Sequence, residues 1–124
     1  MSRPSVSSIV AFVPSKDFAT SKNFYLDLGF EQTWGDDGGC GLRIDGQTII
    51  LQSFYVKKHA ENFMMQLVVD DADAWWKRIQ DLGLKEKYEL GMATAPAMQP
   101  WGLKVLYLSD PTGVLWHIAE VPKK

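Results

Sequence analysis

The stretch LDLGFEQTW, residues 26–34, decides the fold because it returns in the second half of the chain as QDLGLKEKY, residues 80–88. In both copies a glycine follows an Asp-Leu pair, Gly29 in the first and Gly83 in the second. An aspartate suited to a helix N-cap stands at the same distance upstream of each, Asp17 and Asp71. Each copy therefore predicts a helix that begins after the aspartate and ends at the glycine. A repeat of this length indicates one supersecondary unit used twice.

Strand-like segments follow the same order in both copies. They are apolar or alternating runs bounded by Gly, Asp and Pro, a pattern typical of strands. The first copy predicts strands over residues 5–13, 30–34, 40–44 and 47–54. The second predicts strands over residues 63–69, 84–90, 103–109 and 114–121. In each copy one strand precedes the helix and three follow it.

Length and composition limit the class of protein. The 124 residues are enough for one domain, 1–124, with a core of its own. The net charge of −2, without a basic stripe, argues against nucleic acid as a partner. No apolar run approaches the roughly 20 residues that cross a bilayer, and no secretory signal is apparent. Cys40 is the single cysteine, so we expect a reduced, cytoplasmic protein without an internal disulfide.

The segments SKNFYLDLGF, residues 21–30, and LYLSDPTGVLWHIAE, residues 106–120, resemble the vicinal oxygen chelate superfamily. That superfamily includes glyoxalase I, the extradiol dioxygenases and the fosfomycin and bleomycin resistance proteins. The resemblance implies an α+β fold of two βαβββ modules, over residues 5–56 and 62–121, whose sheets curl around a shared cavity. It does not settle the function, because the superfamily contains metalloenzymes and binding proteins.

In the metalloenzymes of the superfamily, four inward side chains hold a divalent metal. By this resemblance the four positions fall on Val10, Ile50, Met64 and His117. Valine and isoleucine carry no donor atom, and the thioether of methionine is a weak ligand for a hard or borderline ion. We therefore expect no metal and no other cofactor.

Strand alternation predicts which side chains line the cavity. The inferred cavity face is apolar with a few polar groups, a composition typical of small-molecule sites. Trp101, in the loop QPWG, is expected to stack on a planar ligand. Two other interpretations remain open: an exposed sheet face without a ligand, and a Trp101 that closes the end of the core. The predicted ligand-binding residues are Phe12, Ile50, Gln52, Phe54, Met64, Gln66, Trp101 and His117.

These observations favour a protein similar to the bleomycin resistance branch, one that sequesters a planar or amphipathic compound without transforming it. The alternative is a glyoxalase-like metalloenzyme (a lyase or isomerase, a dioxygenase or a thiol transferase), or a metal-free enzyme with His117 as a base. For His117 we expect a hydrogen bond to the ligand, while a satisfied histidine within the sheet stays open. We also expect a homodimer, with Trp75 or Trp76 as a contact of the kind that is enriched at interfaces.

Overall fold

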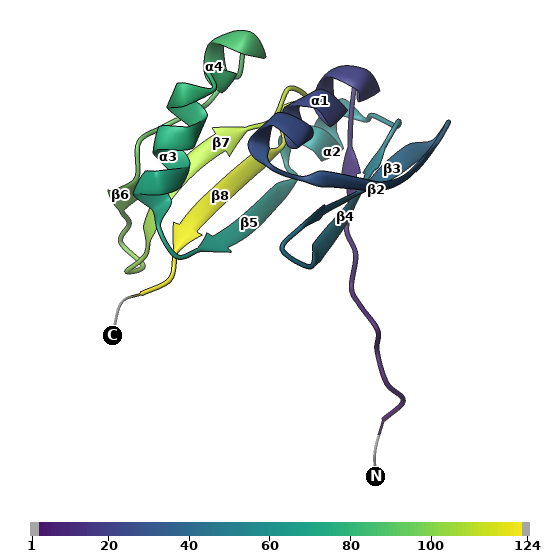
Figure 1. Cartoon of the computed structure of the whole chain (residues 1–124), viewed down its shortest axis with the longest axis horizontal. Coiled ribbons are helices and arrows are strands. Elements are labelled where there is room, and N and C mark those ends of the chain that lie inside the picture. The colour runs from purple at the N-terminus through teal and green to yellow at the C-terminus, as the bar shows by residue number, and fades with distance from the viewer. Residues whose placement is uncertain (1–2, 123–124) are drawn as a thin grey trace.

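The computed structural model describes residues 3–122 and contains two four-stranded sheets, each covered by helices on one side (Figure 1). The sheets curl toward each other without closing, which confirms the predicted α+β architecture of two βαβββ modules. None of the helices described in this range has the length and apolar character needed to cross a membrane. Sheet one has the strand order β1 (Phe12–Pro14), β4 (Gln47–Gln52), β3 (Gly39–Ile44) and β2 (Glu31–Asp36). Sheet two has the order β5 (Met64–Val69), β8 (Leu115–Glu120), β7 (Lys104–Ser109) and β6 (Ala97–Met98).

The two sheets share one pairing pattern. The strand before the first helix, β1, runs parallel to β4, with Phe12 opposite Ile50. The strand before the main helix of the second module, β5, runs parallel to β8, with Gln66 opposite His117. The pair Phe12–Ile50 in sheet one therefore corresponds to the pair Gln66–His117 in sheet two. Residues that correspond in the repeat lie on the same face of their sheets.

The two long helices begin and end where the repeat predicts. Helix α1 (Phe18–Leu28) is capped by Asp17, whose carboxylate accepts a hydrogen bond from the backbone N–H of Thr20 at 3.2 Å. Helix α3 (Ala72–Asp81) is capped in the same way by Asp71. Gly83, just beyond α3, has a φ of 62°, in the left-handed region that favours glycine.

The strand predicted over residues 84–90 is wrong. Leu84–Lys87 form a short helix, α4, and the outer strand of sheet two is β6, which lies further along the chain. Three of the four α4 residues are Lys, Glu and Lys, which favour helix over strand. Leu84 alone is buried there and anchors the turn against the core. A further short helix, α2 (Lys57–Glu61), joins the modules and was not predicted.

The strand predicted over residues 5–13 is also mostly wrong, because only Phe12 and Val13 of that range belong to β1. By the register of β1 and β4, the residues before Ile9 extend beyond Gln47, the first residue of β4, and have no neighbouring strand to pair with. They form an extended N-terminal arm, which we define as residues 3–11, and Figure 1 shows it leaving the body of the molecule. Ile9 of this arm is 93% exposed.

The modules are joined on the helix side by a buried polar contact. Tyr25 on α1 donates a hydrogen bond of 2.6 Å to a carboxylate oxygen of Asp110, and the indole N–H of Trp116 donates to the Tyr25 hydroxyl at 2.9 Å. The other carboxylate oxygen of Asp110 accepts from the backbone N–H groups of Thr112, Gly113 and Val114, each at 2.9 Å. Burial raises the pKa of Asp110 above its ordinary value, although these hydrogen bonds oppose the shift. The DPTG turn is therefore held by a carboxylate within the core.

Candidate functional site

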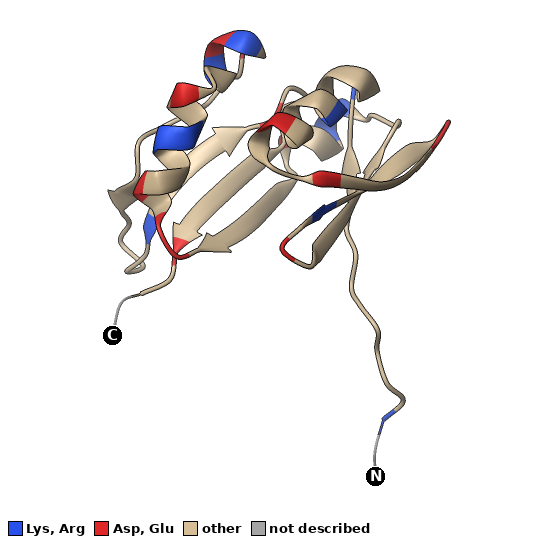
Figure 2. Cartoon of the chain, in the orientation of Figure 1, with Lys and Arg blue, Asp and Glu red and all other residues tan. Residues whose placement is uncertain are grey.

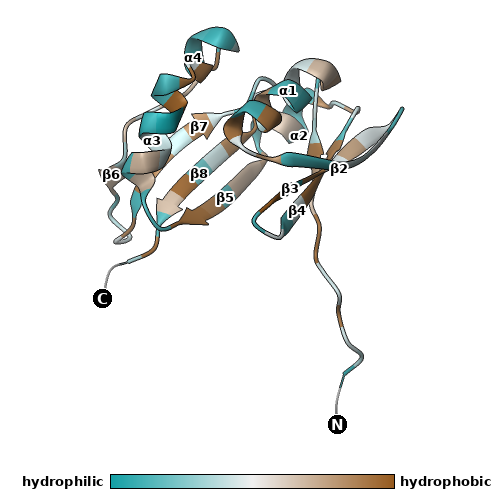
Figure 3. Ribbon diagram, viewed as in Figure 1, coloured by the Kyte–Doolittle hydropathy of each residue, from teal (hydrophilic) through white to brown (hydrophobic). Residues whose placement is uncertain are grey.

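The side of the two sheets that faces away from the helices forms a concave, largely apolar surface. In β5 the side chains alternate: Met65, Leu67 and Val69 pack toward the helices, whereas Met64 and Val68 are exposed. Figure 3 shows hydrophobic residues along the strands of both sheets, and Figure 2 shows that most charged residues lie on helices, turns and strand ends. A surface of this kind favours uncharged, apolar ligands over ions.

Three of the predicted site residues come together in one cavity. Phe12, Gln52 and Phe54 line a recess of about 280 Å³ beside the start of the second module. The rings of Phe12 and Phe54 are 57% and 58% exposed, so they offer apolar area to a ligand or to another chain. The remaining lining residues are Pro14, Val56, His59 and Phe63.

Gln66 lies apart from that recess, in a groove of about 570 Å³ between β4 and β5. The arm residues Ile9 and Ala11 contribute to its wall, together with Thr48 of β4 and Val68 of β5. Trp116 of the core also reaches the floor of this groove. The groove exposes part of the interior between the two sheets, because β4 and β5 belong to separate sheets and are not hydrogen-bonded to each other.

His117 lies in the middle of sheet two, between Gln66 on β5 and Tyr107 on β7. It is half-buried, and its ring meets the Tyr107 ring edge to face at a centroid distance of 4.8 Å and an angle of 76°. The imidazole Nε2 is buried and has no hydrogen-bond partner, a situation found for no other side-chain nitrogen or oxygen in residues 3–122. Buried polar atoms are usually paired, so this atom needs an explanation.

The other predicted site residues occupy separate places. Ile50 is half-buried on β4, next to Phe12, and Met64 is 62% exposed at the start of β5. Trp101 stands on the loop between β6 and β7, next to the outer strand of sheet two, and is 57% exposed. The turn that carries it is closed by a hydrogen bond from the Gly102 N–H to the Gln99 carbonyl at 2.9 Å. Within one chain, Trp101 lines neither cavity described above.

Trp34 is a candidate that the sequence reasoning missed. A β-bulge between Gln32 and Trp34 shifts the pairing of β2 so that Trp34 lies opposite Gly41 on β3. A side chain at Gly41 would collide with the indole of Trp34, which shows that the ring lies across this glycine. The neighbours Cys40 and Leu42 point into the core, so Trp34 covers the concave face, and it is 45% exposed there. The glycine was the available signal, but a bulge cannot be read from alternation alone.

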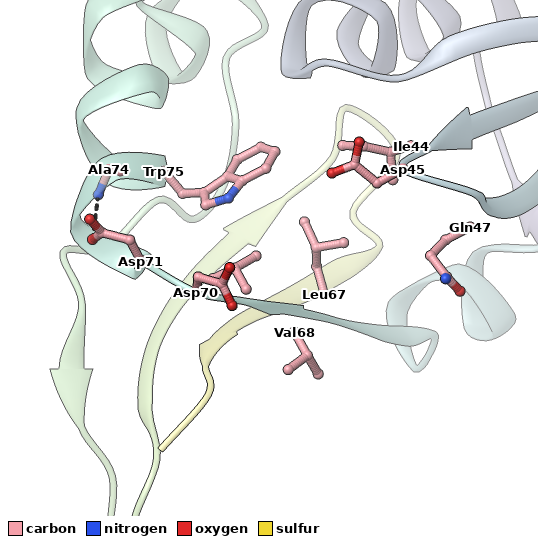
Figure 4. Close-up of a pocket in the computed structure, with 10 residues that line it drawn as sticks. Ile44, Asp45, Gln47, Leu67, Val68, Asp70, Asp71, Ala74 and Trp75 are labelled. Carbon is pink, nitrogen blue, oxygen red and sulfur yellow. Dashed lines mark hydrogen bonds between the residues drawn. The ribbon is translucent and has the colours of Figure 1, made fainter. Parts of the chain in front are cut away.

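A further cavity, of about 340 Å³, lies at the end of the sheets (Figure 4). Asp45 comes from the β3–β4 turn, and Asp70, Asp71 and Trp75 come from the segment that enters α3. Asp71 is already engaged, because its carboxylate accepts the backbone N–H of Ala74 at 3.0 Å. The cavity is acidic, but none of the predicted site residues lines it.

The residues that the resemblance assigns to the superfamily's metal positions do not fit a metal. His117 supplies one imidazole nitrogen, while Val10 and Ile50 supply no donor and Met64 supplies only a thioether. A divalent catalytic metal needs about three protein ligands. Within residues 3–122 there is also no group of three or more His, Cys, Asp or Glu side chains placed to hold an ion.

The comparisons with known proteins agree with this fold. The model of the glyoxalase/bleomycin resistance protein/dioxygenase superfamily matches residues 7–118. A bleomycin resistance protein from Klebsiella pneumoniae is 27% identical over 112 residues, which cover 87% of each chain. The crystal structure of a bleomycin-binding protein complexed with bleomycin superposes with a TM-score of 0.77 at 22% identity, over 94% of this chain and 100% of the other. A lactoylglutathione lyase from Agrobacterium tumefaciens superposes with a TM-score of 0.69 at 17% identity, over 94% and 95%. At these identities the two solved structures show a shared fold and not a shared function, but the family match covers most of the sequence: the chain belongs to the glyoxalase/bleomycin resistance protein/dioxygenase superfamily.

Proposed function

We propose that the protein binds a planar or amphipathic antibiotic-like molecule, without a metal and without transforming it. The observation that carries this proposal is the set of residues at the superfamily's metal positions, where Val10, Ile50 and Met64 offer no useful donor. The similarity to the Klebsiella pneumoniae bleomycin resistance protein supports the same class of function.

The composition of the concave surface supports a stacking mode of binding. Trp34 on sheet one and Trp101 beside sheet two are both partly exposed. The rings of Phe12 and Phe54 are more than half exposed. Planar aromatic ligands gain dispersion and quadrupole interactions against such rings. The proposed binding residues remain Phe12, Ile50, Gln52, Phe54, Met64, Gln66, Trp101 and His117, with Trp34 added.

Calorimetric titration with metal-free bleomycin tests the proposal. We expect binding by protein that elemental analysis shows to be free of nickel, zinc, manganese and iron. Trp101→Ala should weaken the affinity by about two- to twelvefold, the equivalent of roughly 0.5–1.5 kcal/mol for an aromatic contact. Trp101→Phe keeps a ring and serves as the matched control. A stoichiometric metal, lost together with binding on chelation, would contradict the proposal.

We propose further that the protein is a homodimer. The arm carries Val6 and Ile9, which are 65% and 93% exposed. Its part before Ile9 extends beyond the start of β4 and has no strand beside it in its own chain. Phe12, Phe54 and Met64 each expose more than half of their area. A second copy that covers these side chains would remove apolar surface from water, at roughly 25 cal/mol per Å².

Light scattering coupled to gel filtration measures the mass directly, and we expect twice the 14.0 kDa of the chain at micromolar concentration. Ile9→Asp should shift the protein toward the monomer because it places a charge in the apolar contact. Val121→Asp, at a residue that is 44% exposed near the other end of the described chain, is the control. A monomeric wild type across a range of salt concentrations would refute the dimer.

We also propose a cytoplasmic location. The lone thiol of Cys40 is buried and has no partner for a disulfide, as is usual in a reducing compartment. Cell fractionation with an antibody against the native chain tests this, and recovery of the protein from the periplasmic or secreted fraction would contradict it.

A further inference from the structure

We infer that Gln66, His117 and Tyr107 form a hydrogen-bonding row that selects ligands whose planar ring system carries a neutral polar group, such as a hydroxyl, carbonyl or amide, on one edge. The inference rests on the proposed function and names the ligand class of that site. Tyr107 enters here as a binding residue.

The sheet register places the three side chains in one line across the concave surface. Gln66 on β5 lies opposite His117 on β8, and His117 lies opposite Tyr107 on β7. Opposite residues of an antiparallel pair such as His117 and Tyr107 have Cβ atoms about 4.5–5.5 Å apart, so one small ring system can reach the polar groups of both. Gln66 is exposed and Tyr107 is half-buried, which leaves both accessible from the concave side.

The unpaired Nε2 of His117 is the observation that indicates a ligand. A buried nitrogen without a partner destabilises the protein, which a purely structural histidine would avoid. The edge-to-face contact with Tyr107 limits how the imidazole can turn. A ligand that donates to Nε2, or accepts from it in the other tautomer, would satisfy an atom that the protein leaves unpaired.

The surroundings of the row favour a neutral group over a charged one. The neighbouring rows on the same face consist of Met64, Leu115 and Ser109 on one side and Val68, Ala119 and Val105 on the other. The nearest charged residues of these strands, Lys104 and Glu120, are engaged with α3 and its N-terminus through Asp73 and the Ala72 N–H. Among the described residues of β5, β7 and β8, no charged side chain is therefore left beside the row to stabilise an ionic ligand.

The internal repeat places an apolar row on sheet one at the position equivalent to the polar row of sheet two, so the two ends of a ligand meet different surfaces. The equivalent row of sheet one consists of Phe12, Ile50 and Gly41, with the Trp34 indole lying across the glycine. That row is apolar where the row of sheet two is polar. A ligand that contacts both rows must be apolar on one side and carry a polar group on one edge. This is the sense in which the proposed ligand is amphipathic.

Urea unfolding separates this role from a structural one, without any ligand. Tyr107→Phe, Gln66→Leu and His117→Phe should leave the unfolding midpoint unchanged or raised, because each removes a polar group that has no protein partner. A structural role predicts a lower midpoint for His117→Phe, and a clear decrease would overturn the inference.

Binding is then measured with metal-free bleomycin and with the matched pair 2-naphthol and naphthalene, which differ by one hydroxyl. We expect Tyr107→Phe and Gln66→Leu each to weaken one of the hydrogen-bonding probes at least fivefold, and His117→Phe to weaken both at least fivefold. Val121→Leu, at an exposed apolar residue outside the row and outside the cavities described above, is the control and should bind as the wild type does. The wild type should prefer 2-naphthol to naphthalene at least fivefold, and His117→Phe should lose that preference.

The outcomes distinguish the two proposals. If the wild type binds none of the three compounds, the proposed function fails and the selection fails with it. If bleomycin binds but the row variants bind it as the wild type does and the naphthol preference is absent, the row is not part of the site while the proposed function stands. If bleomycin binds and neither naphthalene compound does up to its limit of solubility, the assignment of a planar ring system with a polar edge is overturned.

Discussion

Replacing Tyr25 by phenylalanine removes a single oxygen atom from the buried contact between the modules. That oxygen donates to Asp110 at 2.6 Å and accepts from the Trp116 indole at 2.9 Å. A hydrogen bond to a charged group contributes about 1.5–3 kcal/mol, and a buried donor left unpaired costs about 1–3 kcal/mol. The free energy of unfolding should therefore fall by about 3–5 kcal/mol, at the upper end of the range for single substitutions.

Equilibrium unfolding in urea at neutral pH measures this loss. Tyr55→Phe is the matched control, because Tyr55 is only half-buried and its ring lies near Lys16 at the surface. The control should change the free energy of unfolding by less than about 0.5 kcal/mol. A loss below about 1 kcal/mol for Tyr25→Phe, with an unchanged dependence on urea concentration, would refute the role given to the hydroxyl.

Three further predictions follow from described contacts. Burial raises the folded-state pKa of Asp110 above 3.8, so the stability that the protonated carboxyl contributes is lost as the pH rises through that pKa. Asp110→Asn does not titrate, so its free energy of unfolding relative to the wild type should increase between pH 4 and 7 in urea titrations. A difference that stays constant over this range would contradict the shift. Gly41→Ala should displace the indole of Trp34 and destabilise the protein by about 1–3 kcal/mol, with an altered near-ultraviolet dichroism spectrum; an unchanged spectrum would count against the position given to that ring. The hydrogen bond from Lys87, and after it the hydrogen bond from the Tyr88 hydroxyl, holds the pKa of Asp27 below 3.8. Tyr88→Phe removes the second of these contacts, so less stability should be lost as the pH falls through that pKa, as acid titration followed by circular dichroism would measure. Equal acid sensitivity would argue against the contact.

The repeat made the architecture predictable. The aspartate caps, the glycine stops and the order of strands are local signals, and they placed α1, α3 and most strands within a few residues. The segment at 84–90 failed because the repeat suggested a strand where Lys85, Glu86 and Lys87 favour a helix. The first strand was predicted too long because an apolar segment forms a strand only where another strand lies beside it, and sequence does not show where β4 begins relative to the arm.

The candidate site was predictable in part for a related physical reason. Alternation within a strand identifies the exposed face, so Met64, Gln66 and His117 could be assigned to one side of sheet two. Trp34 was missed because the bulge before it changes which face its side chain occupies. Tyr107 was missed because its significance depends on its neighbour His117, a relation that exists only once β7 and β8 are paired.

Within residues 3–122, the polar contacts between the modules all involve α1 or the residues just before it. Thr112 accepts from the Lys16 N–H and shares a hydrogen bond with Ser21, Tyr25 bonds Asp110, and Arg78 donates to the carbonyl of Leu28. None of these bonds depends on the peptide that connects β4 to α2. The connecting segment could therefore be opened to give two chains that reassociate through α1, and such a split form would report ligand binding as the assembly of two fragments.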